Sequence, residues 1–142
     1  MPDTVPTSGT TLDGLLAGFL TRTPHTSRVV LVSPDGLKIA HAGETDKSEQ
    51  LAASISGMSS LSRGSVRGGV RQFIVEGDIE SLFVTSAGSA AEPATVGTLL
   101  GVVADSEADP GVIGWEMRSL TKSLAEHLST KARTGTHPGQ GR

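Results

Sequence analysis

The sequence contains no cysteine, and its aromatic side chains make up only 3% of the residues. The absence of cysteine excludes disulfide bonds, thiolate metal sites and cysteine nucleophiles, and it fits a protein of the reducing cytoplasm. The aromatic residues are Phe19, Phe73, Phe83 and Trp115. They offer no aromatic cage for a ligand and no stacking surface for nucleotide bases. The core must therefore consist mainly of Leu, Val, Ile and Ala.

Long apolar segments and an excess of positive charge are also missing. No apolar run approaches the ~20 residues of a membrane-spanning helix, and residues 1–6 lack the basic and apolar regions of a signal peptide. The formal net charge is -3 and the isoelectric point is about 5.7, which argues against general binding of nucleic acid. We therefore expect a cytoplasmic domain that neither inserts into membranes nor binds nucleic acid.

Recognisable catalytic motifs are missing too. Serine is abundant, but no Gly-x-Ser-x-Gly elbow of a hydrolase occurs, and the four histidines show neither metal-ligand nor catalytic-triad spacing. The glycines Gly64, Gly68 and Gly69 lack the Lys-Ser/Thr pair that completes a phosphate-binding loop. We expect no enzymatic activity, no catalytic residue, no cofactor and no metal site.

One acidic segment imitates a calcium loop. Asp105, Glu107, Asp109 and Glu116 occupy the first, third, fifth and twelfth positions of an EF-hand-like pattern. The sixth position requires glycine for a sharp turn, and here it is Pro110. An apolar segment typical of a strand, not a helix, precedes it. We therefore interpret the segment as a strand-to-helix turn whose acidic residues favour the N-terminus of the following helix.

The length of 142 residues suits a single domain. Residues 1–10 are rich in Pro, Thr, Ser and Gly and show no apolar periodicity, so they are predicted to be a disordered lead. Residues 130–142 are polar and are predicted to be a disordered tail. The folded domain is predicted to span residues 11–129.

Apolar periodicity predicts a helix–strand–strand–helix–strand–strand–strand–helix order. The helices are expected over residues 12–23, 46–63 and 110–128, and the strands over residues 28–33, 37–42, 70–76, 81–86 and 96–104. One five-stranded antiparallel sheet covered by helices explains this order. The strands at 28–33 and 96–104 are nearly continuous in apolar residues and are expected at central positions. The mixed strand at 70–76 is expected at an edge.

The helix predicted over residues 46–63 carries two different stripes. An apolar stripe is expected to face the core and contains Leu51, Ile55, Met58 and Leu61. A second stripe carries only small side chains, namely Ala53, Gly57, Ser60 and Gly64. Small side chains let another backbone approach closely. The stripe could reflect tight packing on the protein's own sheet, but its angular offset from the apolar stripe favours a contact surface for another chain.

The predicted edge strand contains the consecutive apolar residues Phe73, Ile74 and Val75, flanked by Arg71 and Glu76. An apolar edge strand favours aggregation unless it is charged, covered or paired. Pairing with a second copy of the chain would satisfy it, and the same pairing would bring two copies of the small-residue stripe near one another. We therefore predict a dimer or partner interface formed by the small stripe together with Arg71, Phe73, Ile74 and Val75.

Arg63, Arg67 and Arg71 form the one local cluster of positive charge. It is either a solvated patch or a site for an acidic partner surface. Nucleic acid fits less well, since the chain is acidic and offers no stacking aromatics nearby. Arg63 and Arg67 are candidate contacts for an acidic partner.

The chain resembles a Roadblock/LC7 domain of the bacterial type. The resemblance rests on two N-terminal segments, Leu12-Asp13-Gly14-Leu15-Leu16 and Leu31-Val32-Ser33-Pro34-Asp35-Gly36, and on three later ones, Gly69-Val70-Arg71-Gln72-Phe73-Ile74-Val75-Glu76, Leu82-Phe83-Val84-Thr85 and Asp109-Pro110-Gly111-Val112-Ile113-Gly114-Trp115-Glu116-Met117. Together these segments span most of residues 11–129. Each segment is weak alone, and their order and spacing make the combination specific.

The resemblance implies an α/β (α+β) fold in which two helices cover one face of the sheet and one covers the other. It also implies a homodimer joined through the third strand and the second helix. Members of this family bind or regulate small Ras-like GTPases, and some bacterial members are GTPase-activating proteins. The bacterial members often occur together with a sensor-kinase-like protein. These activators reshape the GTPase, so no arginine finger is assigned. The alternative is a PAS- or profilin-like ligand-sensing or adaptor module, which would need a concave apolar pocket.

Overall fold

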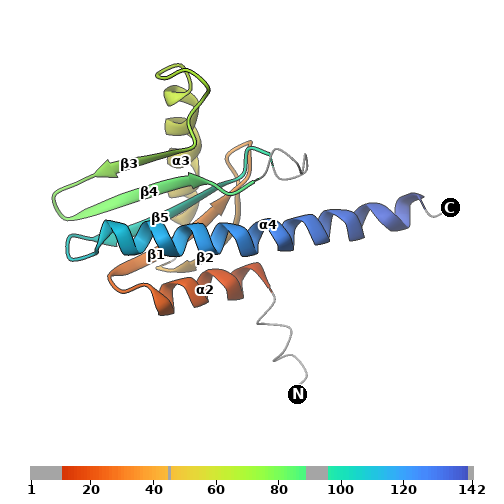
Figure 1. Cartoon of the computed structure of the whole chain (residues 1–142), viewed down its shortest axis with the longest axis horizontal. Coiled ribbons are helices and arrows are strands. Elements are labelled where there is room, and N and C mark those ends of the chain that lie inside the picture. The colour runs from red at the N-terminus through yellow and green to blue at the C-terminus, as the bar shows by residue number, and fades with distance from the viewer. Residues whose placement is uncertain (1–10, 45, 89–95, 141–142) are drawn as a thin grey trace.

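The computed structural model describes residues 11–44, 46–88 and 96–140 (Figure 1), with side chains as far as Leu128. The elements follow the predicted order: α2 (Leu12–Arg22), β1 (Thr26–Val32), β2 (Lys38–Gly43), α3 (Ser48–Ser62), β3 (Gln72–Glu76), β4 (Glu80–Ser86), β5 (Leu99–Asp105) and α4 (Pro110–Gln140). No helix in this described part of the chain is long and apolar enough to cross a membrane.

The strands form one antiparallel sheet in the order β2-β1-β5-β4-β3. The apolar strands β5 and β1 lie inside the sheet, and β3 lies at an edge, as the sequence predicts. Helices α2 and α4 cover one face, and α3 covers the other. The predicted α+β fold, with two helices on one face and one on the other, is therefore confirmed.

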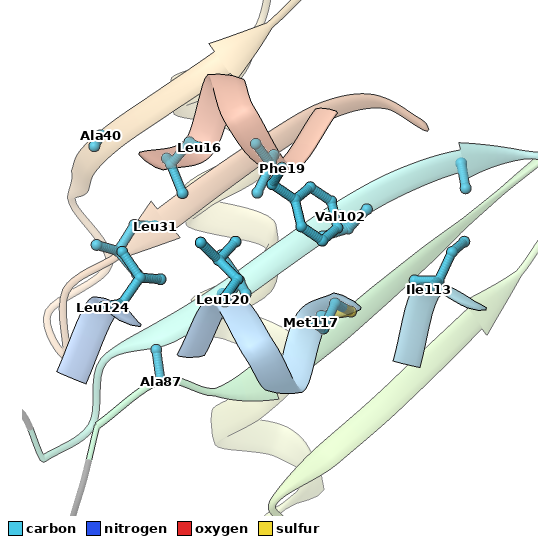
Figure 2. Close-up of a cluster of buried hydrophobic side chains, with 13 residues drawn as sticks. Leu16, Phe19, Leu31, Ala40, Ala87, Val102, Ile113, Met117, Leu120 and Leu124 are labelled. Atoms are coloured by element: carbon cyan, nitrogen blue, oxygen red, sulfur yellow. The ribbon is translucent and has the colours of Figure 1, made fainter. Parts of the chain in front are cut away.

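The larger core lies between the sheet and the pair α2 and α4. Figure 2 shows side chains of the two helices meeting over the strands. The fully buried members of this core include Leu16 and Phe19 of α2 and Ile113, Leu120 and Leu124 of α4. The α4 residues recur at the helical spacing that the sequence shows. This core fixes α4 on the sheet and thereby decides which of its side chains face outward.

A smaller core lies under α3. Ala52 and Ile55 of the helix pack against Val30 and Val32 of β1 and against Val84 of β4. Helix and sheet approach closely where β5 carries Gly101, because a Cβ at that position would overlap the Cδ1 atom of Ile55. The glycine therefore allows α3 to lie close to this strand.

Several turns and caps follow the local sequence signals. Thr11 caps α2 by accepting a hydrogen bond from the backbone N–H of Gly14 at 3.0 Å. The backbone N–H of Gly36 donates to the carbonyl oxygen of Ser33 at 2.9 Å and closes the turn between β1 and β2, where Pro34 and Gly36 occupy the positions typical of a type I turn. Asp109 accepts from the N–H of Gly111 at 2.8 Å at the start of α4. The acidic segment is thus used for a turn and a helix cap.

The end of the last helix differs from the prediction. The sequence predicts that the helix ends near residue 128 and gives way to a polar tail, but α4 continues to Gln140. Extending an existing helix adds one hydrogen bond per residue without a second nucleation step, so a polar composition alone does not end it. The division into a domain of residues 11–129 and a tail stays a prediction, and residues 1–10 lie outside the described residues.

Candidate protein-interaction surface

Strand β3 has an unpaired edge in the described part of the sheet. It pairs with β4 on one side, and Ile74 lies opposite Phe83 in that pairing. The backbone N–H and C=O groups of its other side are therefore available to another strand. The opposite edge strand, β2, differs because both α2 and α3 pack on it. Both edge strands thus lack a strand partner on one side of the described sheet, and they differ in how extensively helices pack on them.

The apolar side chains of β3 alternate between the two faces of the sheet. Ile74 lies on the α4 face with its cross-strand neighbour Phe83, and it is 54% exposed. Phe73 and Val75 lie on the α3 face, where Val75 is 43% exposed and Phe73 is half-buried. An unpaired edge strand with exposed apolar residues on both faces is a suitable site for binding another protein chain.

The small-residue stripe of α3 faces away from the sheet. Its members Ala53, Gly57, Ser60 and Gly64 are all exposed. A Cβ built at Gly57 or Gly64 would meet no atom within 4 Å. The stripe therefore does not serve tight packing on the protein's own sheet, which removes that alternative. Its role as an interface stays a prediction.

The predicted core stripe of α3 is wrong at Leu61. Ile55 is buried and Leu51 and Met58 are half-buried, but Leu61 is 85% exposed. At about 100° per residue, six residues place Leu61 about 120° away from Ile55 around the helix. Successive steps of three residues therefore move the side chain off the core face. Leu61 belongs to the outward surface, beside Gly57 and Gly64.

The three arginines are exposed, and none forms an ion pair with another described residue. Arg63 and Arg71 line one concavity of about 320 Å³ between the C-terminal half of α3 and the ends of β3, β4 and β5. The Nη2 atom of Arg63 donates to the hydroxyl of Ser60 at 3.0 Å. Arg67 lies outside this concavity, in the loop that projects with the end of α3 beyond the sheet (Figure 1).

The fold agrees with the comparison to known proteins. The sequence profile of the Roadblock/LC7 domain matches residues 12–104, well over half of the chain. The chain belongs to the Roadblock/LC7 family. A solved Roadblock/LC7 domain from Streptomyces avermitilis is 44% identical and superimposes with a TM-score of 0.70, covering 80% of this chain and 93% of that chain. No curated protein matches the sequence.

More distant structures share the fold of this Roadblock/LC7 domain. MglB from Myxococcus xanthus is 18% identical, with a TM-score of 0.70 over 83% of this chain and 94% of that chain. Profilin II from Acanthamoeba castellanii is 13% identical, with a TM-score of 0.53 over 80% of this chain and 96% of that chain. At such identities the likeness concerns the arrangement of helices and strands alone.

Two exposed apolar residues of the Roadblock/LC7 domain are not among the predicted interface residues. Leu61 belongs to the predicted core stripe, and Val66, in the loop between α3 and β3, is 58% exposed. The helical angle of Leu61 is a signal that the sequence contains. The exposure of Val66 has no such signal, because loop positions follow no periodicity. Both residues flank the exposed arginines Arg63 and Arg67.

Proposed function

We propose that this Roadblock/LC7 domain is a non-enzymatic, cytoplasmic homodimer that binds a small Ras-like GTPase as its regulator or scaffold. The observation that carries the proposal is the unpaired apolar edge of β3 next to α3, whose exposed side carries the small-residue stripe. Family membership supplies the class of partner. A GTPase-activating role, and a sensor-kinase-like protein as a further partner, are finer parts of the same proposal.

The dimer is proposed to join β3 to β3 and α3 to α3 around a twofold axis. Antiparallel pairing of the two open edges would satisfy their free backbone groups and continue the sheet across both subunits. Ala53, Gly57, Ser60 and Gly64 would let the two α3 helices approach closely.

An Ile74→Asp variant is expected to be monomeric, because a carboxylate would be placed at the centre of the shared strand pair with no cation opposite it. Light scattering should show a mass of one chain where the unaltered protein shows two. The matched control is Ile39→Asp, which places the same change on the exposed face of the covered edge strand β2. A monomeric control, or a variant that stays dimeric, would place the interface elsewhere.

The GTPase is proposed to approach the end of the molecule where Arg63 and Arg67 lie beside Leu61 and Val66. Exposed cations with no described ion pair attract an acidic surface and raise association rates. Leu61 and Val66 would supply an apolar contact from which water is excluded after binding. The test uses a bacterial small Ras-like GTPase that co-purifies with this protein, prepared in its GDP and GTP states.

An Arg63→Glu/Arg67→Glu double variant is expected to bind that GTPase at least about tenfold more weakly, mainly through slower association that depends on salt. Biolayer interferometry at two salt concentrations measures this rate. Hydrolysis of GTP with and without the unaltered protein separates an activator, which accelerates it, from a scaffold, which does not. Absence of binding in both nucleotide states would refute the proposed partner.

The ligand-sensing alternative has one observation in its favour, the concavity that Arg63 and Arg71 line. Its volume of about 320 Å³ lies at the lower end of the ~300–1,000 Å³ of small-molecule sites. Serine and glycine dominate its lining, and no aromatic side chain lines it. A thermal-shift screen with a metabolite panel distinguishes the two functions, because a sensor would gain stability from its ligand.

A further inference from the structure

The outward face of α4 carries an exposed aromatic and apolar surface that the proposed function does not use. Trp115, the single tryptophan of the chain, is 66% exposed, and Val112, one turn before it, is 42% exposed. They are accompanied by Arg118 and Lys122, which follow at helical spacing on the same side. We call Val112, Trp115, Arg118 and Lys122 the α4 surface. It lies on the face of the sheet opposite α3.

A small pocket adjoins the α4 surface. It lies between the first half of α4 and the strands β3 and β4, and its walls include Ile74, Phe83, Gly114 and Met117. Arg118 lines both this pocket and the shallow surface around Trp115, so the two are continuous. Gly114 contributes to the opening because it leaves no side chain between the pocket and the Arg118 guanidinium.

The volume of the pocket restricts what can enter it. It measures about 100 Å³, which is several times the ~30 Å³ share of one water molecule in the liquid. It is also well below the ~300–1,000 Å³ of sites for small-molecule ligands. The pocket itself therefore accommodates one apolar side chain, and the rest of a bound partner would lie on the adjoining open surface around Trp115.

The charges around the pocket indicate the chemistry of the partner. Neither Arg118 nor Lys122 forms an ion pair within the described residues. The neighbouring acid Glu116 is turned towards α2, where it pairs with Arg22 at 3.2 Å. Two unpaired cations beside an apolar pocket complement carboxylates that flank an apolar side chain. The same cations disfavour a second α4 surface, since like charges would face each other.

We propose that the α4 surface binds a short acidic segment of a partner protein. One apolar side chain of that segment occupies the pocket over Ile74 and Phe83, and its carboxylates contact Arg118 and Lys122. Trp115 packs along the bound segment and shields these contacts from water, as exposed tryptophans do at the centres of interfaces. Because the GTPase site proposed at Arg63 and Arg67 follows α3, which covers the other face of the sheet, a GTPase and this segment can be bound at the same time.

The test selects binders from a displayed library of random 12-residue peptides, using the full-length protein as the target. Enriched peptides are expected to contain an apolar residue flanked by Asp or Glu. Since the chain has a single tryptophan, the fluorescence of Trp115 reports binding at this site alone, and its emission is expected to shift to shorter wavelength. No enrichment, or enrichment without acidic residues, would overturn the proposal.

Variants then locate the site. Trp115→Ala is expected to weaken peptide binding roughly 30-fold, as for an interface hot spot, and Arg118→Glu at least about tenfold. The matched control is Lys47→Glu, which reverses an exposed cation at the start of α3 on the other face of the sheet. Equal losses in the control would overturn the proposal. Vesicles with phosphatidylserine that shift Trp115 emission as strongly as the peptides would instead assign the surface to membranes.

Discussion

A Gly57→Arg variant should be a fully folded monomer. Gly57 lies in the exposed small-residue stripe, and a side chain there meets no atom of its own subunit within 4 Å. Arginine also favours the helix over glycine, which ranks roughly 0.8–1.0 kcal/mol below alanine in helix propensity. In the proposed dimer, by contrast, the long charged side chain would separate the two α3 helices. The substitution thus distinguishes the fold of one subunit from the contact between two.

Light scattering measures the outcome as a change from two chains of 14.5 kDa to one. Urea unfolding of the variant should show a subunit that remains folded. The matched control is Ala17→Arg on the exposed side of α2, which adds the same charge to a different helix and should leave the dimer intact. A Gly57→Arg protein that remains dimeric would mean that the small stripe is not at the interface.

A Gly43→Ala variant should lose about 3 kcal/mol or more of unfolding free energy. Gly43 has a φ of 90°, where a side chain costs roughly 1–2 kcal/mol. A Cβ would also overlap the carbonyl oxygen of Ser27 and approach the Cδ1 atom of Leu20 to 2.8 Å. That carbonyl accepts the hydrogen bond from the N–H of Glu44. Overpacking of this kind typically costs a further ~1–3 kcal/mol.

Gly68→Ala is the matched control for this loss. Gly68 has a similar φ of 85°, but nothing lies within 4 Å of a Cβ placed there. It should therefore show the backbone strain alone, about 1–2 kcal/mol. Urea denaturation of both variants gives the difference in unfolding free energy. If the two losses are equal, the contact at Ser27 contributes nothing, and Gly43 is required for its backbone conformation alone.

The order and type of the elements were predictable because they depend on local patterns. The helical recurrence of Ile113, Leu120 and Leu124 places α4 on the sheet. The Ser33–Gly36 turn and the cap by Asp109 are set by a few neighbouring residues. The central position of β5 also follows, since a strand that is apolar throughout must be covered on both faces.

Features that depend on elements far apart in the sequence were harder to predict from the sequence. The sequence predicts β3 as an edge, but which edge lacks helix cover depends on where α2 and α3 settle on the sheet. Leu61 is an exception, because its rotation of about 120° from Ile55 follows from the helical spacing alone. Exposure of Gly57 and Gly64, and the pocket between β3 and α4, likewise require the coordinates of several elements at once.

Local composition and spacing were enough to identify the family, to predict the order of the elements and to show that recognisable catalytic motifs are missing. The tertiary structure decided which residues remain outside after the cores have formed. Ile55 and Leu61 are both apolar residues of α3, yet one is buried and the other is 85% exposed. They lie about 120° apart around the helix, and packing on the sheet covers only the side that carries Ile55. The surfaces available to partners follow from such packing.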